Sequence, residues 1–357
     1  MTMKIGITGK PLTGKTALFQ ALTQGLVQPS FTKEPLHGVV TVPDPRFDYL
    51  VGLYNPKKIT PATIEFIDDA VRFSEERGRE FSDSAMAELR NCDAIIYVIN
   101  AFHDSKPDAS AVKSEAAGFL EELAFRDLVV LENRILRVVK QVKSPNAPPA
   151  LKSEYDLLLR LKELMESGER LDISSLSDVE ARLVAGFQLL TVKPSVIAVN
   201  VAEEAVASAE GDLQEPIEYL NQRNIPVFCL SAEIERQISE LEPEDQAEFL
   251  SALGLTEPMR GKLIRQIYST CNLMTFFTVG DKEVHAWPIP KDSTALEAAE
   301  SIHSDLARGF IRSEVISYAD IQEAGGWDEA KAAGKMLLVG KEHVIQDGDC
   351  LYIRFKV

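Results

Sequence analysis

The chain has 357 residues, which is too long for one ordinary core and predicts two or three domains. A hydrophobic content of 45% and a charged content of 26% are typical of globular proteins, and no apolar run is long enough to predict a membrane span. The net charge of −17 argues against a protein that coats nucleic acid by bulk electrostatics, but it does not exclude a local basic patch.

Cysteine and histidine usage gives no sign of a metal or disulfide framework. The four cysteines are scattered without a C-x-x-C pair, and the five histidines show no ligand spacing. The first residues already follow a strand pattern, so we expect no signal peptide, a cytoplasmic location and no membrane partner.

The most informative stretch is residues 9–16, which read G-K-P-L-T-G-K-T and fit the phosphate-binding loop G-x-x-x-x-G-K-[ST]. A buried-strand pattern precedes it and an apolar helical face follows it, which is the context that the motif requires. Glycines let backbone N–H groups turn towards phosphates, and the helix N-terminus adds partial positive charge. The motif gives Lys15 a contact with the β- and γ-phosphates and Thr16 a place in a Mg²⁺ shell. The sequence therefore predicts a nucleotide-binding protein.

Several continuous apolar runs, separated by helical patterns, predict a parallel sheet covered on both faces. These runs are residues 3–7, 39–42, 63–68, 93–100, 195–200 and 225–230. Ligands of such sheets lie at the carboxyl ends of the strands, and this places the glycine loop, Asp68, Asn200 and Ser231 along one edge. An Asp at a strand end is usually a cap, but beside a glycine loop we expect Asp68 to hold Mg²⁺.

Between residues 106 and 189 the pattern becomes helical. Apolar residues from Leu128 to Val142 are spaced three and four apart, a proline-rich turn follows at 144–149, and a second amphipathic run extends from Leu151 to Met165. This pattern predicts an antiparallel coiled-coil hairpin, which either contacts a partner or serves as a plain packing element.

The last 85 residues or so form a third pattern. We expect a hairpin from residues 274–279 and 283–288, a helix over 294–308, and three short strands at 335–339, 343–345 and 350–355. The predicted domains are thus a P-loop domain (1–105 and 190–272), a helical insertion (106–189) and a small α+β domain (273–357).

These residues together resemble the YchF/Obg-like ATPase family over essentially the whole chain. The resemblance rests on the glycine loop, on V-P-D-P-R at 42–46, on N-V-A-E at 200–203 and on Q-D-G-D at 346–349. It implies a GTPase-like P-loop domain with an inserted coiled coil and a C-terminal ubiquitin-like TGS module. It also implies a slow, ATP-preferring hydrolase, with GTP sometimes accepted, that uses Mg²⁺ and has the ribosome as its partner.

The resemblance also assigns site residues. Phosphate contacts fall on the loop and the first helical residues, namely Gly9, Pro11, Leu12, Thr13, Gly14, Lys15, Thr16 and Ala17. Thr32 would close over the γ-phosphate in catalysis beside Lys15. The base would be read by Asn200, Val201, Glu203, Ser231 and Ala232. The guanine-specific N-K-x-D pattern, whose acid accepts hydrogen bonds from guanine, is absent at 200–203, and this fits a preference for ATP.

Departures from the family pattern leave other functions open. The family's D-x-x-G glycine is Val71 here, followed by Arg72, and His103 is no secure counterpart of the family's hydrolytic histidine. Val71 and Arg72 favour a second hypothesis, in which the protein is a nucleotide-sensing adaptor that scarcely hydrolyses. A third hypothesis is a nucleotide-dependent RNA binder that uses a basic groove between domains; the acidic balance of the chain weighs against it.

Overall fold

The computed structural model describes residues 3–27, 35–68, 83–103, 106–167, 171, 175–255 and 257–356. The described residues form two compact units. Unit 1 comprises residues 3–38 and 65–260, and unit 2 comprises residues 39–64 and 261–357. The chain passes between the units within β2 (Leu36–Thr41), β4 (Thr63–Asp68) and α11 (Met259–Thr270).

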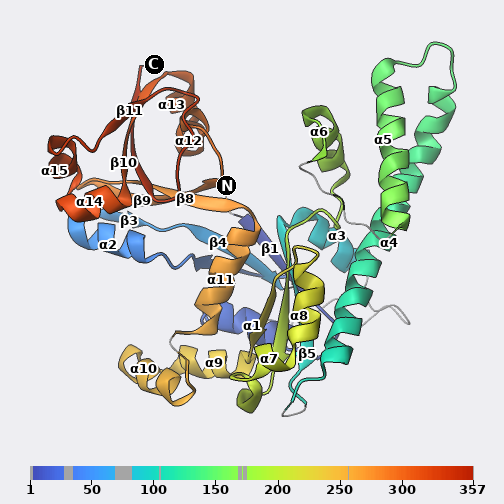
Figure 1. The fold of residues 1–357 in the computed structure, drawn as a ribbon, viewed down its shortest axis with the longest axis horizontal. Helices are drawn as coiled ribbons and strands as arrows, with labels where there is room; N and C mark the ends of the chain where they lie inside the picture. Colours follow the sequence, from blue (N-terminus) through green and yellow to red (C-terminus); the bar gives the residue numbers. More distant parts are fainter. Residues whose placement is uncertain are drawn as a thin grey trace. The chain divides into compact units, whose positions relative to one another are not determined.

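A six-stranded sheet in the order β2-β4-β1-β5-β6-β7 organises unit 1 (Figure 1). Its other strands are β1 (Met3–Thr8), β5 (Ala94–Ala101), β6 (Ser195–Val201) and β7 (Val227–Leu230). The helices of this unit are α1 (Lys15–Leu22), α3 (Asp83–Asn91), α4 (Ala109–Val142), α5 (Pro149–Glu166), α6 (Asp178–Phe187), α7 (Ala209–Asp212), α8 (Gln214–Asn221), α9 (Ala232–Glu240) and α10 (Pro243–Ala252). The pairs β1–β5, β5–β6 and β6–β7 are parallel, as the apolar runs predicted.

The predicted coiled-coil hairpin is present, although its first helix is longer than the heptad pattern indicated. Figure 1 shows α4 and α5 side by side, and they share an apolar core with Leu131, Leu158 and Leu161. The lower part of α4 packs against the sheet core through residues such as Phe119, whose ring stacks on Tyr97 at 3.9 Å.

A fully buried carboxylate near the middle of α4 joins this helix to neighbouring segments. Asp127 is 0% exposed and accepts hydrogen bonds from Arg90 Nη1 at 2.8 Å and from the backbone N–H and hydroxyl of Thr191 at 2.8 and 2.9 Å. A buried charge is tolerated only when it is paired and hydrogen-bonded in this way.

A second six-stranded sheet, in the order β11-β10-β12-β8-β9-β3, organises unit 2. Its strands are β3 (Lys58–Thr60), β8 (Leu273–Thr278), β9 (Glu283–Pro290), β10 (Phe310–Ser317), β11 (Leu337–Val339) and β12 (Asp349–Phe355). Its helices, besides the part of α11 that follows residue 260, are α2 (Pro45–Tyr54), α12 (Ala295–Ile302), α13 (Ser304–Arg308), α14 (Tyr318–Ala324) and α15 (Trp327–Ala332). The core that includes Phe276, Val315 and Leu351 lies between this sheet and α12–α13.

Unit 2 contains β10, α14 and α15, which the sequence analysis did not predict, and it differs from the prediction in three further places. The segment 39–64 belongs to this unit and adds β3 as a parallel edge strand beside β9. The predicted single helix over 294–308 is interrupted at His303, whose extended backbone and ring cap a separate α13. Residues 343–345 form an isolated bridge between Val344 and Thr294 instead of a strand.

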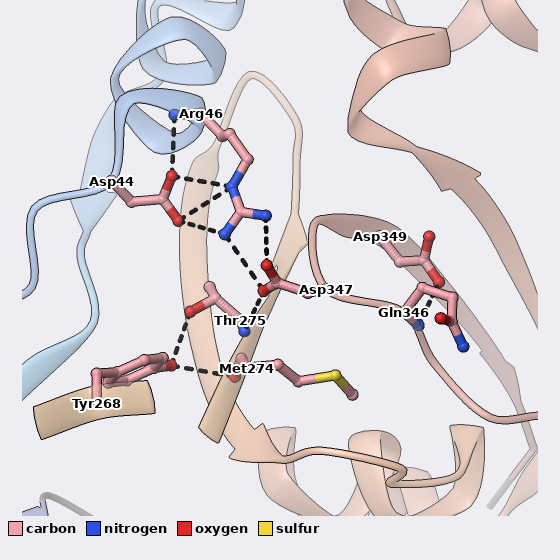
Figure 2. Close-up of polar contacts among 8 residues, drawn as sticks. All are labelled: Asp44, Arg46, Tyr268, Met274, Thr275, Gln346, Asp347 and Asp349. Atoms are coloured by element: carbon pink, nitrogen blue, oxygen red, sulfur yellow. Dashed lines mark hydrogen bonds and ion pairs between the residues drawn. The ribbon is translucent and has the colours of Figure 1, made fainter. Parts of the chain in front are cut away.

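A polar network ties segment 39–64 into unit 2 (Figure 2). Arg46 donates to Asp347 through Nη1 at 2.8 Å and to Asp44 through Nη2 at 2.8 Å. Asp347 also accepts the backbone N–H of Thr275 at 2.9 Å, and the hydroxyls of Thr275 and Tyr268 are 2.7 Å apart. Residues 301 positions apart in the sequence are therefore joined by two charge-assisted hydrogen bonds.

Candidate functional site

The glycine loop connects β1 to α1 at the carboxyl edge of the unit 1 sheet. Its backbone has positive φ at Gly9 (152°), Leu12 (63°) and Gly14 (90°), which turns the chain into the concave shape that binds anions. A Cβ atom at Gly9 would lie 2.4 Å from the carbonyl oxygen of Val98, so the motif glycine is required by close packing.

Lys15 is the first residue of α1 and is 5% exposed. Its ammonium donates to the carbonyl oxygen of Lys10 at 2.5 Å, and the Thr13 hydroxyl donates to the same oxygen at 3.0 Å. Burial lowers the pKa of Lys15 to about 8, while the nearby Asp68 carboxylate opposes that shift. A buried cation of this kind is stabilised by a bound anion.

Thr16 and Asp68 meet beside this lysine. The Thr16 hydroxyl donates to Asp68 Oδ2 at 2.9 Å, and Asp68 is fully buried at the end of β4, the neighbour of β1 in the sheet. A carboxylate and a hydroxyl next to a phosphate loop are oxygen ligands that fit Mg²⁺, which usually takes its remaining ligands from phosphates and water. The two residues assigned to the metal are thus brought together.

Asn200 connects the loop to the opposite side of the site. Its amide Nδ2 donates to the carbonyl oxygen of Thr13 at 3.1 Å, and its Oδ1 accepts the backbone N–H of Ala232 at 3.0 Å. Gly14 is packed against the same amide, because a Cβ there would lie 2.3 Å from Asn200 Nδ2. Ser231 caps α9 by accepting the N–H of Ile234 at 3.4 Å.

The remaining predicted site residues occupy different environments. The side chain of Val201 is 1% exposed in the sheet core, so contact with a base would have to use its backbone. Glu203 begins a 3₁₀ turn and accepts a weak hydrogen bond from Gln237 Nε2 at 3.4 Å. Pro11 and Leu12 are exposed, whereas Ala17 is partly buried. Thr32, Val71 and Arg72 lie outside the described residues.

Sequence analysis missed the link between the loop and α4. Lys10 Nζ lies 3.7 Å from Glu115 Oε2, and the Tyr97 hydroxyl donates to the other carboxylate oxygen of Glu115 at 3.4 Å. Glu115 lies on α4, far along the chain from Lys10, and no motif marks it. Its partners could only be found once the packing of α4 on β5 was known.

Two negative findings apply to the part of the chain that the structure describes. No group of three or more His, Cys, Asp or Glu side chains is arranged to hold a metal ion there. None of the described helices has both the length and the apolar composition needed to cross a membrane.

The glycine loop, the Thr16–Asp68 pair and the mostly parallel sheet define the class of this protein, which is a P-loop NTPase. The family model YchF-GTPase_C, described as "Protein of unknown function (DUF933)", matches residues 273–356. The chain belongs to the YchF/Obg-like ATPase family, as its relatives show over their full lengths.

Two relatives and one solved structure illustrate this membership. The "Ribosome-binding ATPase YchF" of Bacillus subtilis is 38% identical, with 100% of both chains covered. "Obg-like ATPase 1" of Oryza sativa subsp. japonica is 31% identical over 99% of this chain and 92% of its own length. The structure of the Schizosaccharomyces pombe YchF GTPase matches 99% of this chain and 98% of its own, with a TM-score of 0.86 and 26% identity. The fold class expected from the sequence is therefore confirmed.

Proposed function

We propose that unit 1 binds a nucleoside triphosphate with Mg²⁺, prefers ATP to GTP and hydrolyses it slowly. The observation that carries the proposal is the buried Lys15 at the end of the glycine loop, next to the Thr16–Asp68 pair. In the structure the Lys15 ammonium donates to the carbonyl oxygen of Lys10. A triphosphate would take the place of the Lys10 carbonyl as its partner.

The chain's own residues position and neutralise the phosphates. The backbone N–H groups of the loop would bind phosphate oxygens, and Lys15 would lie against the β- and γ-phosphates. Thr16 and Asp68 would hold Mg²⁺, which supplies charge neutralisation on the phosphate oxygens when it is bound. Thr32, by its resemblance to the family's threonine, is proposed to close over the γ-phosphate.

The ATP preference is supported by hydrogen-bonding capacity near the base. Guanine presents an acceptor at O6, whereas adenine presents an amine at the same position. The Ala232 N–H, a donor on the base side of the site, is already used by Asn200 Oδ1. The Glu203 carboxylate, which occupies the place of the guanine-reading acid, is drawn towards Gln237. Both features weaken guanine recognition and leave adenine unaffected.

The proposed macromolecular partner is the ribosome. The Bacillus subtilis and Haemophilus ducreyi relatives carry the name "Ribosome-binding ATPase YchF", and each matches the whole chain. The α4–α5 hairpin and the C-terminal residues 273–357 are proposed as the contact surfaces, and the cytoplasm as the location. Co-sedimentation of the intact protein with ribosomes, with and without ATP, tests this part of the proposal.

A sensor that binds ATP or GTP without turnover is the second candidate, and Val71 and Arg72 favour it. Phosphate release from the intact protein, compared with that from a Lys15→Ala variant, separates the two. Slow release that disappears in the variant supports a hydrolase, whereas tight binding without release above the variant supports a sensor. If Val71 is the cause of inactivity, Val71→Gly should raise release over that of the unaltered protein.

RNA is retained as a further proposed partner. A basic groove between domains was the surface expected for it from the sequence. The charge distribution within unit 2 favours a different surface, which is described next.

A further inference from the structure

Two arginines lie directly opposite each other on neighbouring strands of unit 2. Arg312 of β10 is the register partner of Arg354 of β12, and both are exposed. Like charges at directly opposed positions destabilise a sheet. Arg312 has no ion-pair partner within the described part of the chain. Arg312 therefore lies opposite a second cation and has no carboxylate partner of its own among the described residues.

The carboxylate of Glu314, near these arginines, contacts two cations. Glu314 is 3% exposed, accepts from Arg354 Nε at 2.7 Å and lies 3.3 Å from Lys331 Nζ. Glu314 thus contacts two cations, and Arg312 is a third cation on the same pair of strands that this carboxylate does not contact. Residues 273–357 contain nine basic and fourteen acidic residues, so this excess of positive charge is local and runs against the composition of the segment.

An exposed aromatic ring lies beside the arginines. Glu314 pairs with Tyr352 on one side and with Leu338 of β11 on the other, so these side chains share a face with Arg312 and Arg354. Tyr352 is 61% exposed and Leu338 is 46% exposed. We call this surface, made by Arg312, Leu338, Tyr352 and Arg354, the arginine face.

The opposite face of the same strands is covered. Val315, Leu351 and Ile353 pack with Leu306 and Ile302 in the core beneath α12 and α13, and Figure 1 shows both helices against that side of the sheet. Lys331 of α15 contacts Glu314 at the border of the arginine face. The ring of Tyr352 is thus held by a rigid strand and is not used for packing the core.

We propose that the arginine face binds a single strand of RNA, with a base stacked on Tyr352 and phosphates against Arg312 and Arg354. Sequence-tolerant binding of single strands combines exposed aromatic rings with cations that follow the backbone, and the arginine face presents both on adjacent strands. The paired arginines favour a polyanion over an apolar protein segment, which would leave them without partners. This inference rests on the proposed function insofar as the ribosome supplies such RNA.

Binding of a labelled single-stranded RNA of about 12 nucleotides to the intact protein, followed by fluorescence anisotropy, tests this proposal. Over about 50 to 200 mM salt we expect Arg312→Gln to lower the slope of log K against log salt by about 0.7, the loss of one phosphate contact. Tyr352→Ala should weaken binding about tenfold through lost stacking, and Tyr352→Phe should bind as the unaltered protein does.

Arg308→Gln is the matched control, because Arg308 is an exposed arginine of α13 on the covered side of the sheet. Its salt slope should equal that of the unaltered protein. Absence of RNA binding, or equal effects of Arg308→Gln and Arg312→Gln, would overturn the proposal. Tryptophan fluorescence of each variant, from Trp287 and Trp327 in unit 2, verifies that the sheet is folded.

Ribosome co-sedimentation with the same variants separates this inference from the proposed function. Ribosome binding that depends on Tyr352 and Arg312, without oligonucleotide binding, would mean that the face contacts a ribosomal protein and would refute the RNA assignment. Oligonucleotide binding that depends on these residues, without ribosome binding, would uphold the arginine face and refute the ribosome as partner.

Discussion

Replacing Asn200 with Ala should damage the nucleotide site, because it removes the side chain that joins the glycine loop to the start of α9. Asn200 is 6% exposed and makes two hydrogen bonds, to Thr13 O at 3.1 Å and from Ala232 N at 3.0 Å. Truncation leaves a carbonyl and an N–H group without partners in a buried place. Each such loss costs about 1–2 kcal/mol, so we expect unit 1 to be destabilised by about 2–4 kcal/mol.

The assay can distinguish the two units. Both tryptophans of the chain, Trp287 and Trp327, lie in unit 2, so their fluorescence follows that unit, whereas far-UV circular dichroism follows both. In urea, Asn200→Ala should lower the midpoint of the dichroism transition and leave the tryptophan transition in place. Nucleotide affinity should fall at least tenfold, because the loop and the α9 turn lose their common anchor.

Asn200→Asp is a second test variant, since it keeps the shape of the side chain and the hydrogen bond from the Ala232 N–H. It places a carboxylate oxygen against the Thr13 carbonyl, so it should be as harmful as the alanine near neutral pH. The reasoning fails if Asn200→Ala binds nucleotide within about twofold of the unaltered protein and unfolds at the same urea concentration.

Three further predictions concern charged side chains. The pKa of Lys15 is about 8 in the folded protein and about 10.4 when unfolded, so the unfolded chain binds more protons between these values. The contribution of Lys15 to the free energy of unfolding should therefore rise from pH 8 to 10.4, by roughly 3 kcal/mol at most. The difference in that free energy between the unaltered protein and Lys15→Met should change by this amount in urea titrations, and a difference that is constant with pH would contradict it. Asp127→Ala should lower the free energy of unfolding of unit 1 by about 3–5 kcal/mol, because Arg90 loses its buried partner. Asp127→Asn should lower it clearly less. Unfolding followed by circular dichroism measures both losses, and equal losses would contradict this prediction. Arg46→Lys should lower the stability of unit 2 by about 1–2 kcal/mol, since an ammonium cannot bind Asp44 and Asp347 bidentately. Unfolding followed by tryptophan fluorescence measures this loss. An unchanged midpoint would contradict a stabilising role for the contacts of Arg46.

Local patterns were sufficient to predict the strands of the unit 1 sheet and the glycine loop. The run at 63–68 became β4 with the predicted ends, and Asp68 reached Thr16 because β4 and β1 are neighbours. The coiled-coil hairpin followed from heptad spacing in the same way. These features depend on short-range periodicity or on a fixed motif, which one sequence contains in full.

Features that depend on distant contacts were not predictable. The Lys10–Glu115 pair and the Arg46–Asp347 pair join residues far apart in the sequence, with no local signal for either partner. Segment 39–64 belongs to unit 2 because β3 pairs with β9, although the chain order suggested the P-loop domain. The arginine face depends on strand register, which a sequence pattern alone does not fix.

The most direct test of the account is an equilibrium titration of the intact protein with fluorescent ATP and GTP in the presence of Mg²⁺. We expect ATP to bind at least about tenfold more tightly than GTP, with both affinities lost in Lys15→Ala. Equal or tighter binding of GTP would contradict the base-recognition argument from Asn200, Ala232 and Glu203. Binding that survives Lys15→Ala unchanged would contradict the assignment of the glycine loop as the nucleotide site.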